Sequence, residues 1–247
     1  MTKTLLLIHG YPLDHTLWND VISKMAPGVR ILAPDLPGFG GAPVSPGEPS
    51  IDMLADVMDR LLSEQNIDRA VVAGMSMGGY VALSLAERHP ARVAGLGIVS
   101  SHPFKDSGEA RRLRMAMIRR IRGEGAEVAA TSMIPRAFAS ISESRPELLA
   151  HIIQGAARSG VDGLCWALEA MANRRDLSGL LKRIDIPVHV IHGKEDKIIP
   201  VTRAREFARF ARHGAITEIA AAGHMTPVEN PTAVAEGLND LIARSSA

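Results

Sequence analysis

Apolar residues occur along this chain in short unbroken runs, most of them followed by a longer segment whose apolar positions recur every three or four residues. An unbroken run is typical of a strand covered on both faces, and the longer recurrence is typical of a helix with one buried face. The predicted strands are residues 5–8, 29–33, 70–73, 93–99, 186–191 and 216–220. The predicted helices are residues 17–25, 51–65, 79–89, 202–212 and 232–243. The alternation predicts an α/β fold with a mostly parallel central sheet flanked by helices.

One long segment departs from this alternation. Residues 101–181 show no convincing strand and contain four helix-like pieces, at 108–123, 126–139, 146–158 and 162–174. A helical block inserted after a strand is expected to lie over the strand ends, where open α/β sheets bind ligands. The sequence therefore predicts a core made of residues 1–100 and 182–247, with residues 101–181 inserted as a helical lid.

Charge and cysteine content narrow the expected partners. The 247 residues carry a formal net charge of +1, which gives no indication of nucleic acid or of an anionic membrane surface. No apolar stretch approaches the length of a membrane span, so we expect no stable membrane association. Cys165 is the only cysteine, which excludes an internal disulfide and favours a cytoplasmic location. No cysteine and histidine cluster has zinc spacing, and the oligomeric state is not predicted.

The clearest chemical signal is a serine between the predicted strand 70–73 and the predicted helix 79–89. Ser76 stands at the centre of Gly74-Met75-Ser76-Met77-Gly78. A serine on such a sharp turn projects its hydroxyl away from the backbone, and the glycines leave room for the adjoining strand and helix. Ser76 is therefore the predicted nucleophile.

A serine nucleophile needs a base to take its proton and a third group to orient that base. His224 follows the last predicted strand, and Asp196 follows the strand before it. All three side chains are then expected at one edge of the sheet, in the chain order of one specific hydrolase architecture. Glu195 and Asp106 are rival candidates for the carboxylate.

A tetrahedral intermediate also needs hydrogen-bond donors for its oxyanion. The backbone N–H of Met77 is one expected donor, and the N–H of Tyr11, in the loop after the first strand, is the other. Pro12 has no N–H to donate. The ring of Tyr11 either lines the acyl pocket or packs the loop. The lid residues proposed for the substrate pocket are Met133, Phe138 and Trp166.

Five motifs in order along the chain resemble the α/β-hydrolase fold family, most closely its small carboxylesterases and cofactor-free perhydrolases (non-haem haloperoxidases). These motifs are His9-Gly10-Tyr11-Pro12, Asp35-Leu36-Pro37-Gly38-Phe39-Gly40, Gly74-Met75-Ser76-Met77-Gly78-Gly79, Gly193-Lys194-Glu195-Asp196 and Ala222-Gly223-His224. The resemblance implies a triad of Ser76, Asp196 and His224, with Tyr11 and Met77 as the oxyanion hole. Members of the family usually begin with an antiparallel hairpin, which is missing here, so we expect about six parallel strands.

The expected activity is hydrolysis of small to medium carboxylic esters through an acyl-enzyme intermediate, with no cofactor or metal. A small-molecule ester with an uncharged acyl group is the expected substrate. Lactone hydrolysis, C–C bond hydrolysis and perhydrolysis use the same three residues and stay open. Two functions of a different class stay open as well: a ligand receptor that keeps the triad but turns over slowly, and an interaction protein with an inert site.

Overall fold

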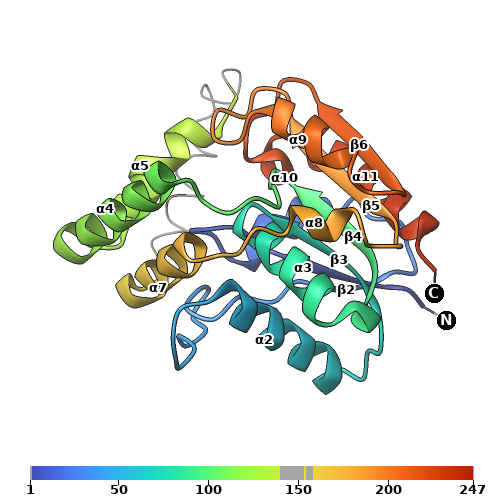
Figure 1. The fold of residues 1–247 in the computed structure, drawn as a ribbon, viewed down its shortest axis with the longest axis horizontal. Helices are drawn as coiled ribbons and strands as arrows, with labels where there is room; N and C mark the ends of the chain where they lie inside the picture. Colours follow the sequence, from blue (N-terminus) through green and yellow to red (C-terminus); the bar gives the residue numbers. More distant parts are fainter. Residues whose placement is uncertain (1, 140–152, 154–157, 247) are drawn as a thin grey trace.

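The computed structural model describes residues 2–139, 153 and 158–246 (Figure 1). Its six strands form one sheet in the order β2-β1-β3-β4-β5-β6, and every neighbouring pair is parallel. The strands are β1 Thr4–Ile8, β2 Arg30–Leu32, β3 Ala70–Met75, β4 Val93–Val99, β5 Val188–Gly193 and β6 Gly214–Ile219. The predicted α/β fold with about six parallel strands is confirmed.

Helices cover both faces of the sheet because successive side chains of each strand point to opposite faces. Leu6 and Ile8 of β1 pack in one apolar cluster, whereas Leu5 and Leu7 pack in the other. The first face is covered by α2 Ile51–Glu64, α3 Met77–Arg88, α8 Ser178–Leu181 and α9 Val201–Ala208. The second is covered by the short helix η1 His15–Trp18 together with α1 Asn19–Ile22, α10 Thr226–Glu229 and α11 Pro231–Arg244. The short helix η2 Pro90–Arg92 leads from α3 into β4.

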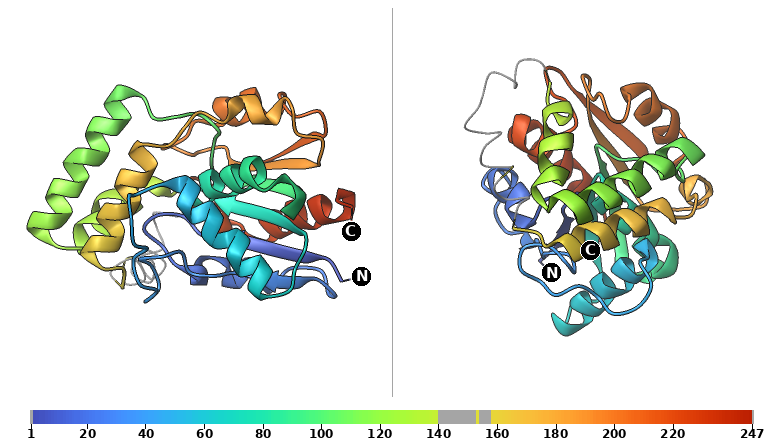
Figure 2. Two further views of the ribbon diagram at one scale, coloured as in Figure 1. Left: turned by 60° about the horizontal axis from the view of Figure 1, so that its bottom comes forward. Right: turned by 90° about the vertical axis from the view of Figure 1, so that its left-hand side faces the viewer.

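The segment between β4 and β5 is helical. It contains α4 Gly108–Glu124, α5 Glu127–Ala137 and α7 Val161–Ala172, which match three of the four predicted pieces. The fourth, residues 146–158, lies almost entirely outside the described residues. Figure 2 shows α4 and α7 beyond the end of the sheet that points away from both chain termini, where the strands have their C-terminal ends. The division into a core and an inserted lid at residues 101 and 181 stays a prediction.

Local sequence fixes where these helices begin and end. The hydroxyl of Ser107 accepts the N–H of Ala110 at 3.1 Å and so caps the first turn of α4, which stops before Gly125. Asn230 caps α11 in the same way, and Pro231 occupies the first helical position, where no N–H is needed. Within the described part of the chain, no helix is both long and apolar enough to cross a membrane.

Candidate active site

Ser76 lies on the turn between β3 and α3 with a backbone that few residues adopt. Its φ of 51° and ψ of −111° place it in a strained region for a residue that carries a β-carbon. The end of β4 holds the turn in place, because the Ser76 N–H donates to Val99 O at 2.9 Å and the Ser101 hydroxyl donates to Ser76 O at 2.7 Å. The strain is therefore supported by neighbouring main chain, as expected for a nucleophile elbow.

The glycines on either side of Ser76 allow strand and helix to approach each other closely. A β-carbon on Gly74 would lie 2.0 Å from Gly78 O, and one on Gly78 would lie 2.1 Å from Ile8 O. Both distances are too short for two non-bonded atoms, so no larger residue fits at either position without moving the backbone. The spacing of this motif is thus a packing requirement of the turn.

Three segments far apart in the sequence bring Ser76, His224 and Asp196 together. His224 Nε2 lies 3.0 Å from Ser76 Oγ, and His224 Nδ1 lies 2.7 Å from Asp196 Oδ2. His224 and Asp196 are both buried. A carboxylate can only accept, so Nδ1 carries the hydrogen and Nε2 is left free to take the serine proton. This geometry can convert a serine hydroxyl into a nucleophile.

The Asp196 carboxylate has partners on all sides. Its Oδ1 accepts the N–H groups of Ile198 and Ile199, both at 2.8 Å, and His192 Nε2 lies 3.3 Å from its Oδ2. Burial alone would raise the pKa of the Asp196 carboxyl, but the charge of His224 and the hydrogen bonds from His192 and His224 lower it well below its usual range. Asp196 is therefore held as a carboxylate at neutral pH.

The two rival carboxylates lie elsewhere. Glu195 is exposed, whereas its neighbour Asp196 is buried against His224. Asp106 pairs instead with Arg174 at 2.5 Å and with Arg114 at 2.6 Å, in a separate buried cluster. Of the three acidic candidates, Asp196 is the one that the structure brings to the imidazole.

The two residues proposed for the oxyanion hole come from the serine turn and from the loop after β1. Met77 is the first residue of α3, and N–H groups in the first turn of a helix have no carbonyl partner within it. Tyr11 lies in a tight turn that is closed by a hydrogen bond from the Leu13 N–H to Gly10 O at 2.9 Å. The use of both N–H groups as oxyanion donors stays a prediction.

His9, a buried histidine in the loop after β1, is not among the site residues predicted from the sequence. The Leu36 N–H donates to His9 Nε2 at 2.9 Å, so the hydrogen of the neutral ring sits on Nδ1, 3.1 Å from Gly10 O. Burial lowers the pKa of His9 and keeps the ring neutral. His9 thereby joins the loop that carries Tyr11 to the loop after β2.

The side chains proposed for the pocket differ in their surroundings. Phe138 is fully buried in the cluster that covers the α11 face, whereas Trp166 and the half-buried Met133 pack on the other side. The Tyr11 ring is buried edge-on to Phe39, and its hydroxyl has no hydrogen-bond partner among the described residues. The pocket roles of Met133, Phe138 and Trp166 stay predictions.

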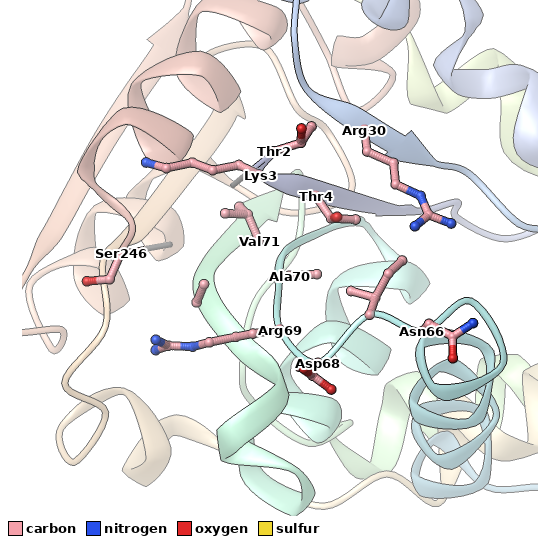
Figure 3. A pocket seen from close by; sticks show the side chains of 12 residues that line it. Thr2, Lys3, Thr4, Arg30, Asn66, Asp68, Arg69, Ala70, Val71 and Ser246 are labelled. Atoms are coloured by element: carbon pink, nitrogen blue, oxygen red, sulfur yellow. The ribbon is translucent and has the colours of Figure 1, made fainter.

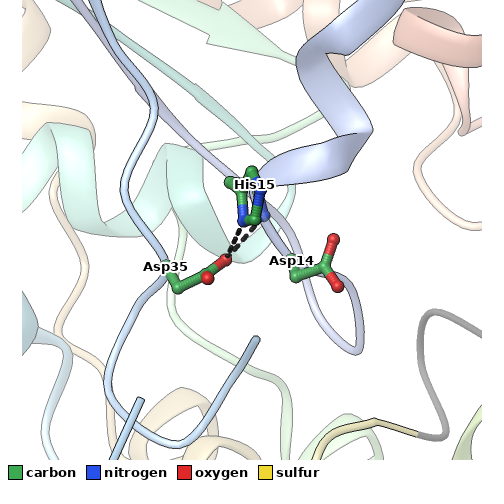
Figure 4. A group of neighbouring side chains, drawn as sticks. All are labelled: Asp14, His15 and Asp35. Atoms are coloured by element: carbon green, nitrogen blue, oxygen red, sulfur yellow. Dashed lines mark hydrogen bonds and ion pairs between the residues drawn. The ribbon is translucent and has the colours of Figure 1, made fainter. Parts of the chain in front are cut away.

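One cluster has side chains of a metal-binding kind (Figure 4). Asp14, His15 and Asp35 each place one ligand atom within 4.8 Å of the others. However, His15 donates its N–H to Asp35 Oδ1, and its Nδ1 also bonds that oxygen, each at 2.8 Å, while Asp14 Oδ2 pairs with Arg158 at 2.7 Å. Because these groups are already engaged, the cluster serves to join the loops that follow β1 and β2.

A hollow of about 400 Å³ lies at the opposite end of the sheet (Figure 3). It is lined by the beginnings of β1 and β3 and includes Lys3, Arg30 and Arg69. The Lys3 ammonium donates to Ile242 O at 2.8 Å and to Ser245 O at 2.7 Å, so it holds the end of α11. None of its lining residues belongs to the serine site, which remains the one with catalytic geometry in the described structure.

Known proteins resemble this chain over nearly its whole length. A sequence profile of the alpha/beta hydrolase family matches residues 5–237. A pimeloyl-[acyl-carrier protein] methyl ester esterase from Aromatoleum aromaticum is 27% identical, covering 96% of this chain and 97% of its own. A thermophilic esterase from Thermogutta terrifontis superposes with a TM-score of 0.93 at 32% identity, over 98% of this chain and 89% of its own. The enol-lactonase from Burkholderia xenovorans LB400 superposes with a TM-score of 0.89 at 25% identity, over 98% of this chain and 92% of its own. This chain belongs to the alpha/beta hydrolase family.

Proposed function

We propose that this protein is a serine hydrolase that cleaves small to medium carboxylic esters through an acyl-enzyme intermediate. The observation that carries the proposal is the continuous hydrogen-bonded series from Ser76 Oγ through His224 to Asp196, at 3.0 and 2.7 Å. The names of two similar proteins, an esterase and a methyl ester esterase, support ester hydrolysis.

In the acylation step, Ser76 Oγ forms a bond to the ester carbonyl carbon while its proton moves to His224 Nε2. The imidazolium that results donates through Nδ1 to the Asp196 carboxylate, whose low pKa keeps it ionised. The carbonyl oxygen becomes negative and accepts the N–H groups of Tyr11 and Met77. The bond to the alcohol oxygen then breaks, and His224 Nε2 returns its proton to the leaving alcohol.

In the deacylation step, water takes the place of the alcohol. His224 Nε2 accepts a proton from the water as its oxygen bonds to the acyl carbon. The second tetrahedral intermediate collapses, the acid leaves, and Ser76 Oγ recovers its proton from His224. The cycle consumes one water, and its proton transfers use only the residues of this site.

Lactone hydrolysis is the second candidate because a lactone is an internal ester and follows the same steps. The similarity to an enol-lactonase at 25% identity supports this candidate. C–C bond hydrolysis and perhydrolysis require the same nucleophile and base, and a common fold does not choose between them.

The test is a panel of p-nitrophenyl esters of increasing acyl length, with lactone and thioester members, assayed with the wild type and with Ser76→Ala. We expect turnover by the wild type and a loss of about 10³-fold or more in the variant. A fluorophosphonate probe should label Ser76 in the wild type alone. A wild type that turns over none of these compounds and resists the probe would favour a receptor or an interaction protein instead.

A further inference from the structure

The end of α5 is bonded to the loop that carries His224. The N–H groups of His224 and Met225 both donate to Ala137 O, at 2.7 and 3.1 Å. Ala137 is the last residue of α5, so its carbonyl has no partner within that helix. The main chain of His224 and Met225 is therefore held by a residue that lies 87 positions before His224 in the sequence.

A carboxylate joins the same two segments a second time. Glu229, the last residue of α10, accepts the Ala139 N–H with Oε1 at 2.7 Å and the Gly223 N–H with Oε2 at 2.8 Å. Each oxygen thus serves one of the two segments. Hydrogen bonds to an ionised carboxylate are about twice as strong as neutral ones, so we expect this bridge to be stronger than the two main-chain bonds to Ala137 O.

The two segments also touch through their backbones. A β-carbon on Gly223 would lie 2.6 Å from Ala139 N and 2.7 Å from Phe138 C, so only glycine fits there without displacement. The Phe138 side chain is fully buried, which anchors residues 137–139 in the core. The His224 loop therefore packs closely against a buried segment.

Position matters for His224 because its two ring nitrogens must meet two partners at once. A displacement of about 1 Å in a catalytic group can cost on the order of 10²-fold in rate. His224 lies outside any helix or strand, so its neighbours decide its position. Ala137 O and Glu229 supply these neighbouring contacts.

We propose that Glu229 is a positioning residue, whose carboxylate binds residues 137–139 to the His224 loop and so sets the imidazole against Ser76 and Asp196. Glu229 acts through its hydrogen bonds from the main-chain N–H groups of Gly223 and Ala139. The inference rests on the proposed serine hydrolysis. It also gives the C-terminal end of α5 an indirect part in catalysis, through the main chain of the His224 loop.

The first test compares Glu229→Ala and Glu229→Gln with Glu236→Ala, which removes an exposed glutamate of the adjacent α11. We expect Glu229→Ala to lower kcat on a p-nitrophenyl ester by about 10- to 100-fold, with KM changed by less than about 3-fold. Glu229→Gln keeps one acceptor oxygen and should recover part of the loss. Glu236→Ala should behave as the wild type.

Two further measurements separate positioning from stability. Fluorophosphonate labelling of Ser76 should slow in parallel with kcat, and the downfield proton resonance of His224 Nδ1–H should shift or broaden in Glu229→Ala at temperatures where the protein is folded. A variant that unfolds more easily but keeps the wild-type kcat and labelling rate in its folded fraction would overturn the proposal.

The second test separates the same segments while Glu229 itself is kept. Gly223→Ala should produce the same selective loss of kcat, whereas Gly123→Ala, where a β-carbon meets nothing within 4 Å, should not. If Glu229→Ala fails to fold, the comparison of Gly223→Ala with Gly123→Ala still tests whether the contact between the two segments sets kcat. If Gly223→Ala and the folded Glu229 variants keep kcat within about 2-fold while Ser76→Ala is inactive, the positioning role is wrong and the serine mechanism stands. An active Ser76→Ala would instead refute the serine mechanism.

Discussion

His192 Nε2 lies 3.3 Å from Asp196 Oδ2, so the carboxylate that orients His224 also faces a second imidazole. Both side chains are fully buried. The same Nε2 is 2.7 Å from Ile199 O, which can only accept, so Nε2 carries the hydrogen and His192 is a donor. Asp196 is thus held by a second imidazole in addition to that of His224.

The Asp196 carboxylate should be essential for turnover and dispensable for folding. The variant Asp196→Asn replaces the charged carboxylate, which fixes the His224 tautomer, with a neutral amide. We therefore expect it to lower kcat by about 10⁴-fold. The matched control is Glu195→Gln, one residue earlier and exposed, which should keep wild-type activity. Ester hydrolysis and circular dichroism of the two variants check this. Equal losses in both would move the acid role away from Asp196.

His192 should contribute to both stability and rate. His192→Phe keeps a ring of similar size but removes the donor, which leaves Ile199 O unsatisfied and raises the pKa of Asp196. We expect a loss of about 1–3 kcal/mol in the free energy of unfolding and a lower kcat. Urea unfolding and ester hydrolysis are the measurements, with the exposed His213→Phe as control. Unchanged unfolding would show that the donor is not needed.

Asp106 should matter for stability because it is the shared partner of two guanidinium groups. The side chains of Asp106 and Arg174 are each only 4% exposed, and Asp106→Asn would leave Arg174 and Arg114 without their counter-charge. Breaking such a buried pair costs about 3–5 kcal/mol. The control is Asp185→Asn, which removes an ion pair to Arg212 whose side chains are 70% and 75% exposed and should cost about 0–1 kcal/mol. Equal free energies of unfolding for Asp106→Asn and Asp185→Asn would contradict the stabilising role of Asp106.

Mild acid should destabilise the fold through the half-buried His102. Burial, assisted by the charge of Arg174, lowers the pKa of His102 to about 3 from its ordinary value of 6.5. Between those values the unfolded chain takes up a proton that the folded protein does not, so the free energy of unfolding falls as pH decreases. We expect a lower urea midpoint at pH 5 than at pH 7, and a smaller difference in His102→Gln. The same pH dependence in both proteins would exclude His102 as a source.

The central strands could be predicted from sequence because helices cover both of their faces, which makes β1, β3 and β4 almost unbroken apolar runs. The short helices could not be predicted, because α8 and α10 have four residues each, which is too few to show a helical period. Ser76, Asp196 and His224 could be selected because each follows a strand. Glu229 could not, since its role depends on a contact with Ala139, 90 residues away.

The bond from Ala137 O to the main chain of His224 has a consequence for protein engineering. A chimera that exchanged residues 101–181 for the corresponding part of a homologue would place a different main-chain carbonyl beside His224 and a different main-chain N–H beside Glu229. Grafts intended to change substrate preference would then also alter the turnover number. Crossovers that carry the stretch from Gly223 to Glu229 along with the transplanted helices would keep the two properties separate.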